Sequence, residues 1–350
     1  MNIYSQFFKN ETLKKNFFKA IRFAMPIIVL AIIFLHIDFK DFQKALKKTD
    51  QNLAIIGFIH APLLILIASY RWKLLLNAFY KNQIIKFKFV LEKYWIGLSL
   101  GFFSPASLGM DAFRIFAFGK KIGNYSHGIA VIIVEKIVAL INCGFLILFL
   151  YPYIPVSTNE LLGDIIYITY LVLIVILSGA SFIFYLARNK SIAKIINYFI
   201  KKFDMFIRKS LGRNVFSNSS IENLFTFKTI FNSLNWLSFS IVFLLSISIQ
   251  VISSIKSHIF FMSLGYDIPF IINLFAAPTL YFIFMLPISL GSVGIREGVY
   301  ILLYSLFGVP KEIALIVSLL NFGGMILNAV IGGFIMLFQK KTEIYLKSKN

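Results

Sequence analysis

Charged side chains are scarce in this sequence: they make up 14% of its 350 residues, and only 15 residues are Asp or Glu. Ordinary soluble domains carry about 25% charged residues, so a chain of this composition has too few to cover a water-exposed surface. Hydrophobic residues reach 59%, and the mean hydropathy is +0.81. These values exclude an ordinary soluble domain and indicate a single membrane domain over residues 1–350.

Cysteine and histidine are also rare. Cys143 is the one cysteine, so no internal disulfide is possible and we expect it to be packed within a helix. The four histidines are scattered without metal-ligand spacing, which predicts no metal site. No GxxxxGK[ST] loop for nucleotide phosphates occurs, and we expect no cofactor.

Long apolar runs are what the sequence does contain. A helix needs about 20 predominantly apolar residues to cross the hydrocarbon core. Six runs approach that length: 19–37, 52–70, 127–150, 164–186, 229–254 and 312–338. The sequence therefore predicts an all-α polytopic membrane protein with about six full transmembrane helices.

The basic residues lie between these runs and predict the orientation. Most of the 35 Lys and Arg residues fall in segments 1–22, 71–93, 119–127, 187–228 and 339–350. Cytoplasmic loops are enriched in such residues, so we expect a multi-pass protein of the cell membrane with both termini in the cytoplasm. Segment 187–228 has helical apolar spacing and predicts a basic amphipathic helix on the inner leaflet. The net charge of +20 thus reflects orientation, and we expect no nucleic-acid partner.

Two further apolar stretches do not fit as single crossings. Residues 94–118 begin and end beside cytoplasmic segments, and residues 269–310 begin and end outside if the tail is inside. Pro, Ser and Gly interrupt each stretch near its middle. We interpret both as re-entrant hairpins, which occur at membrane depth when protein encloses them. The alternative is two ordinary helices in each region, which brings the total to eight to ten helices.

A short motif occurs once in each of these stretches. Residues 105–114 and 287–296 share Pro, Ser, Leu, Gly and Arg at matching positions. The hairpins are expected to enter from opposite faces, so residues 19–150 and 164–338 would form an inverted repeat. In such folds the interrupted helices meet near the midplane and form the substrate site.

The residue types in the motifs suit an anion. Proline releases the backbone from a continuous helix, glycine permits close approach, and freed amides beside an arginine attract negative charge. The predicted structural positions are Pro105, Gly109, Pro287, Gly291 and Gly294. The predicted head-group residues are Arg114, Arg296, Asp111, Glu297, Ser107 and Ser289.

Glu135 and Lys136 lie eight or nine residues inside a predicted span. Ionisable groups at membrane depth are costly and are usually paired, so these two residues are a possible intramembrane charge pair. Both a functional role and a purely structural role remain open for them.

Three segments resemble the lysylphosphatidylglycerol synthase transmembrane region, a flippase-like family. Arg71-Trp72-Lys73-Leu74-Leu75-Leu76 is similar to the Arg-Trp-x-x-Leu-Leu element of the family. Residues 103–114 and 286–298 resemble its Pro-x-x-x-Gly-Gly-Asp-x-x-Arg and Pro-x-x-x-Gly-x-x-Gly-x-Arg-Glu-Gly elements. Met110 replaces the second Gly of the first signature, and Glu135-Lys136 stands where Asp-Arg is typical.

The resemblance implies movement of an anionic phospholipid or polyprenyl-phosphate lipid between leaflets. The chain ends soon after its last predicted span, so we expect the stand-alone form without an aminoacyltransferase domain and without lysyl transfer. Arg71, near the inner face, would receive the head group. The alternatives are a membrane-embedded transferase and a scaffold for a separate lipid-modifying enzyme. The sequence does not indicate the oligomeric state.

Overall fold

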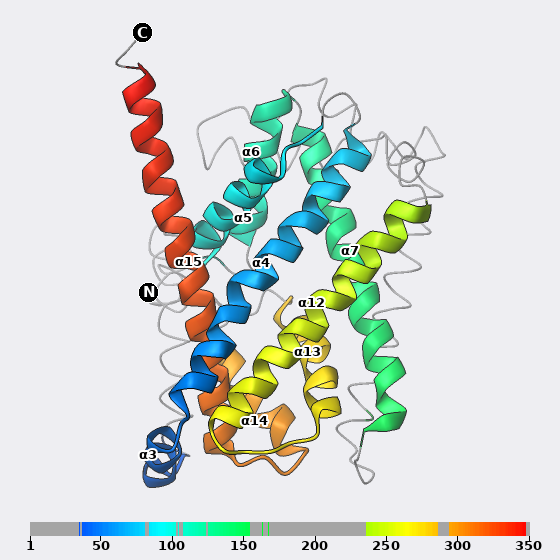
Figure 1. The fold of residues 1–350 in the computed structure, drawn as a ribbon. Coiled ribbons are helices and arrows are strands. Elements are labelled where there is room, and N and C mark those ends of the chain that lie inside the picture. The colour runs from blue at the N-terminus through cyan, green and yellow to red at the C-terminus, as the bar shows by residue number, and fades with distance from the viewer. Residues whose placement is uncertain are drawn as a thin grey trace, which may run out of the picture.

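The computed structural model describes residues 37–80, 84–102, 108–123, 125–154, 236–285 and 294–347, together with Leu35, Ser104, Gly163 and Tyr167. These parts of the chain form nine α-helices and one 3-10 helix and contain no strand (Figure 1). The predicted all-α polytopic architecture is confirmed. The helices are α3 (Phe39–Lys47), α4 (Gln51–Phe79), α5 (Phe87–Gly101), α6 (Leu108–Ile122), α7 (Tyr125–Leu150), η1 (Tyr151–Tyr153), α12 (Trp236–Ser263), α13 (Phe270–Phe284), α14 (Ile295–Ser305) and α15 (Lys311–Lys347).

Four helices in the described part are long and apolar enough to cross a membrane. They contain the spans Gln51–Phe79, His127–Tyr153, Leu237–Ser263 and Lys311–Phe338, which match four of the six predicted runs. The predicted runs 19–37 and 164–186 lie almost wholly outside the described residues, and the predicted amphipathic segment 187–228 lies entirely outside them.

The helix ends follow local sequence signals. The Asp50 side chain accepts hydrogen bonds from the backbone N–H groups of Asn52 and Leu53, at 2.8 and 3.2 Å, and so caps the start of α4. Asp38 caps α3 in the same way. α12 continues to Ser263, beyond the predicted end at residue 254. Lys256, which follows the apolar run, is buried inside the bundle instead of marking a loop.

α5 and α6 form one helix–break–helix pair, and α13 and α14 form another. α5, α6 and α13 have 15 residues each and α14 has 11. At 1.5 Å per residue these helices are at most about 22 Å long, whereas the hydrocarbon core is about 30 Å thick. Each pair therefore has the form that the sequence predicts for a re-entrant hairpin.

The two pairs lie at opposite ends of the bundle. α5 and α6 lie at the end where α4 finishes and α15 protrudes, and α13 and α14 lie at the end that carries α3 (Figure 1). The division into repeats 19–150 and 164–338 remains a prediction, because much of the second range lies outside the described residues.

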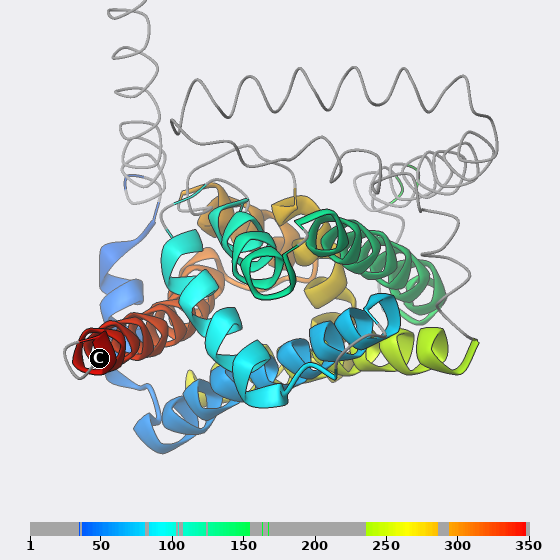
Figure 2. The same ribbon diagram turned by 90° about the horizontal axis from the view of Figure 1, so that it is seen from above.

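The buried apolar side chains gather in two clusters, one around each pair. Trp72, Tyr94, Met110 and Phe118 belong to the cluster around α5 and α6. Phe260, Phe275 and Tyr304 belong to the cluster around α13 and α14. α4 and α12 lie side by side along one side of the bundle (Figure 2) and connect the two halves.

Candidate functional site

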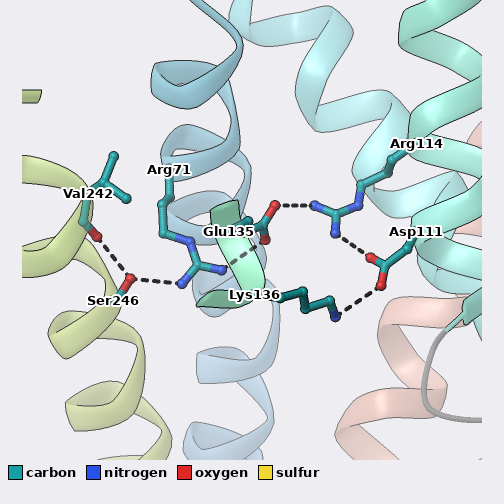
Figure 3. A network of polar contacts seen from close by, with 7 residues as sticks. All are labelled: Arg71, Asp111, Arg114, Glu135, Lys136, Val242 and Ser246. Atoms are coloured by element: carbon teal, nitrogen blue, oxygen red, sulfur yellow. Dashed lines mark hydrogen bonds and ion pairs between the residues drawn. The ribbon is translucent and has the colours of Figure 1, made fainter. Parts of the chain in front are cut away.

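A buried network of charged side chains, here called the arginine cluster, joins α4, α6 and α7. Its members are Arg71, Asp111, Arg114, Glu135 and Lys136 (Figure 3). The two carboxylate oxygens of Glu135 accept from different arginines, each at 2.9 Å: Oε1 from Arg71 Nη2 and Oε2 from Arg114 Nη1. Asp111 accepts from Arg114 at 2.5 Å and from Lys136 at 3.0 Å.

The helical period explains which groups meet. Asp111 and Arg114 are three residues apart on α6 and therefore share one face, as the sequence predicted. Glu135 and Lys136 are consecutive on α7 and point in different directions. The possible pair between them is therefore replaced: Glu135 binds the two arginines, and Lys136 binds Asp111.

Arg71 reaches from α4 to α12. It sits about two turns before the end of α4, is buried, and donates at 3.0 Å to Ser246 of α12. Ser246 in turn donates to the carbonyl oxygen of Val242 at 2.9 Å. Arg71 thus connects the arginine cluster to α12.

Two aromatic rings flank Arg114. The guanidinium carbon lies 5.1 Å from the centre of the Trp72 ring and 4.8 Å from that of Tyr94, within the range of cation–π attraction. Arg114 is 1% exposed. Tyr94 and Ser246 were not predicted as site residues, because neither stands beside a motif.

The four buried members, two arginines and two acids, balance in charge, and Lys136, whose side chain is 32% exposed, adds one positive charge. The Nε atoms of Arg71 and Arg114 are buried and have no hydrogen-bond partner among the described residues. Buried charge is costly unless it is paired and hydrogen-bonded. The arrangement therefore favours an additional anion.

The break between α5 and α6 is built around small residues. Ser104 accepts from the N–H of Gly109 at 2.8 Å and so caps α6. A Cβ atom on Gly109 would lie 2.9 Å from Ser104 Oγ, and one on Gly101 would lie 2.7 Å from Met110 Cβ. Met110, which replaces a family glycine, is thus accommodated by a glycine on the facing helix.

Arg296 and Glu297 form a second charged site at the start of α14. The Arg296 guanidinium donates to Glu297, and the other carboxylate oxygen of Glu297 accepts from the N–H of Gly294 at 2.6 Å. Gly294 has a φ of 83°, a conformation that favours glycine. Arg296 lies over the ring of Phe322, 4.2 Å from its centre, and 3.6 Å from the sulfur of Met325. Glu297 therefore both pairs with Arg296 and caps α14.

The structure does not describe every predicted site residue. Pro105, Ser107, Pro287, Ser289 and Gly291 lie outside the described residues. Within the described ranges, no group of three His, Cys, Asp or Glu side chains is placed to hold a metal ion. Cys143 is buried in α7, as predicted, and accepts from Gln250 at 3.2 Å.

The helices and the arginine cluster define a multi-pass membrane protein with ion-paired side chains inside its helix bundle. Residues 20–332 match the family described as the lysylphosphatidylglycerol synthase transmembrane region. Since the match covers most of the chain, the protein belongs to this family.

Three archaeal relatives extend along nearly the same length. A UPF0104 membrane protein of Methanocaldococcus jannaschii is 26% identical, covering 90% of this chain and 93% of its own. One from Pyrococcus horikoshii is 22% identical, covering 91% and 98%. A third, from Methanothermobacter thermautotrophicus, is 20% identical, covering 85% and 86%. No solved structure matches the chain significantly.

Proposed function

We propose that this protein moves an anionic lipid, with a phosphate or polyprenyl-phosphate head group, between the leaflets of the cell membrane. The observation that carries the proposal is the arginine cluster, in which two buried arginines keep Nε groups without a partner in the described ranges and Lys136 adds one positive charge in excess. Ionisable residues at membrane depth generally mark the pathway of a substrate or an ion. A lipid phosphate supplies both the missing negative charge and several hydrogen-bond acceptors.

The placement of the arginines supports the proposal. Arg114 follows the break before α6, and Arg296 follows the break before α14. The amino-terminal end of a helix favours an anion through its free amides and its dipole. The α5–α6 pair and the α13–α14 pair lie at opposite ends of the bundle (Figure 1). A head group approaching from either leaflet would therefore meet an arginine.

The acidic residues would release the arginines in exchange for phosphate. Asp111 and Glu135 already accept from two cations each, so their oxygens are engaged and poorly placed to take a proton from a substrate. This disfavours a membrane-embedded transferase. A scaffold role would not require arginines buried at membrane depth.

Transport in proteoliposomes tests the proposal. The single variants Arg114→Gln and Arg296→Gln keep a polar side chain but remove the charge. We expect each to reduce translocation of a fluorescent phosphatidylglycerol analogue by about tenfold or more, because a charge-assisted hydrogen bond contributes about 1.5–3 kcal/mol.

The control is Lys120→Gln, which removes a positive charge from an exposed position on α6. It should translocate at the wild-type rate. Normal folding of all variants is checked by their elution and melting profiles. Wild-type rates in both arginine variants would exclude the proposed function.

A further inference from the structure

α12 carries a buried cation that the charged sites above do not include. Lys256 is 8% exposed, and none of the acidic residues in the described ranges forms an ion pair with it. It lies seven residues before the end of α12. A lysine near a helix end usually extends its amine toward water, but this side chain is enclosed by protein.

Lys256 belongs to the surroundings of Arg296. The next residue, Ser257, accepts from Asn321 of α15 at 3.4 Å. Phe322, which follows Asn321, lies over the Arg296 guanidinium. Arg296 is also close enough to Lys256 to repel it electrostatically. Three helices, α12, α14 and α15, therefore bring the two cations to one place.

The one acidic residue described beside Arg296 does not balance the charges of the two cations. Glu297 is shared between Arg296 and the N–H of Gly294, which leaves the charge of Lys256 uncompensated. The buried Nε of Arg296 also has no hydrogen-bond partner among the described residues. Two cations with one acid in a low-dielectric interior are unfavourable unless an anion binds between them.

We propose that Lys256 and Arg296 form a second binding site for a phosphate-bearing anion, separate from the arginine cluster. The identity of the anion as a lipid head group rests on the proposed function. The ligand class itself, a phosphate mono- or diester, follows from the ammonium and guanidinium groups.

A buried polar face of α12 connects the two sites. Arg71 of the arginine cluster donates to Ser246, and the buried residues Gln250 and Ser254 follow at four-residue spacing. Lys256 lies ten residues beyond Ser246, a rise of about 15 Å. Ser257, which is buried and lies on the same face, continues this row to the level of Lys256.

Binding to the purified full-length protein in neutral detergent tests the second site. The probes are dioctanoyl phosphatidylglycerol, dioctanoylglycerol as its phosphate-free counterpart, and inorganic phosphate, and native mass spectrometry follows each binding step. We expect Lys256→Met to weaken one phosphatidylglycerol step by about tenfold or more, and Lys256→Arg to stay within about threefold of wild type. The exposed control, Lys120→Met, should bind like wild type.

Melting temperatures without added lipid separate a ligand-binding lysine from a structural one. We expect Lys256→Met to melt above wild type, because it removes an uncompensated buried charge. Unchanged phosphatidylglycerol binding in Lys256→Met, or a fall in its melting temperature that Lys256→Arg restores, would overturn the second site. Lys256-dependent binding of inorganic phosphate without binding of phosphatidylglycerol would overturn the lipid assignment.

Transport by the same variants separates the two proposals. If wild type does not translocate lipid but Lys256-dependent binding holds, the proposed function fails and the second site stands. If wild type translocates and Lys256→Met keeps both its rate and its binding, the second site fails and the proposed function stands.

Discussion

Glu135 holds two guanidinium groups with one carboxylate. Because each of its oxygens accepts from a different arginine, this residue of α7 ties α4 to α6 inside the bundle. It also sets the charge of the arginine cluster, since without it three cations would face Asp111 alone. We therefore expect the loss of Glu135 to destabilise the protein more than the loss of any other member of the arginine cluster.

We expect Glu135→Gln to destabilise the protein by about 3 kcal/mol, because removing one partner of a buried ion pair leaves the other charges uncompensated. Thermal unfolding in detergent measures the loss. Added phosphatidylglycerol should raise the melting temperature of this variant more than that of wild type, since the lipid phosphate would replace the missing negative charge.

The control for this prediction is Asp267→Asn, which removes an exposed carboxyl group between α12 and α13 and should melt like wild type. An equal response to lipid in Glu135→Gln and wild type would argue against an anion taking the place of the carboxylate.

Part of this site could be predicted from the sequence. The contacts that could not be predicted join residues of different helices, far apart along the chain. Asp111 and Arg114 could be paired in advance because they share one face of a single helix. The contact between Arg71 and Glu135 depends on how α4 packs against α7, which residue spacing does not reveal. Lys256 was missed because a lone lysine after an apolar run resembles the start of a loop.

At the scale of helices, α15 and α5 approach closely. A Cβ atom on Gly332 would lie 2.0 Å from the carbonyl oxygen of Trp95, whereas one on Gly333 would lie 3.5 Å from Ser99 Oγ, an ordinary contact. Small residues commonly allow such approach between membrane helices. Because α5 also carries Tyr94, which contacts Arg114, this packing supports the arginine cluster.

We expect Gly332→Ala to destabilise the protein by about 1–3 kcal/mol, the usual cost of overpacking. Gly333→Ala is the matched control. It adds the same methyl group to the same helix and brings the same gain in helix propensity, about 1 kcal/mol. Chemical or thermal unfolding compares the two. Similar stability in both variants would contradict the close approach of α5 and α15.

The helices themselves were largely predictable. Length and apolarity alone located the four spans now described, because backbone groups in a bilayer must be satisfied within the segment. The interruptions in residues 94–118 and 269–310 also indicated where helices break. The end of α12 was predicted wrongly, because the burial of Lys256 is a tertiary effect.

The whole molecule has two unlike ends. The end of α4, the start of α7 and the end of α15 lie at one end of the bundle, and α3 and η1 lie at the opposite end (Figure 1). The basic loops predict that the first end faces the cytoplasm. The native Cys143 is fully buried, so cysteines introduced elsewhere can report the orientation.

We expect Lys120→Cys to react with a membrane-impermeant maleimide only after the cytoplasmic side is exposed. Tyr153→Cys, at a position 65% exposed in η1, should react from outside in intact cells. Unmodified protein, with Cys143 alone, provides the background. The reverse pattern of labelling would invert the orientation.

The spacing along α12 has an electrical consequence. The rise of about 15 Å from Ser246 to Lys256 is about half of the 30 Å hydrocarbon core. A singly charged anion moving between the two sites would therefore cross at most about half of the membrane potential, which corresponds to at most about 1.2 kcal/mol per 100 mV, or about a sevenfold bias in occupancy. In the orientation that the basic loops predict, with a negative cytoplasm, that bias would favour the site at Lys256, and the resting voltage of the cell would itself help to drive an anionic lipid outward.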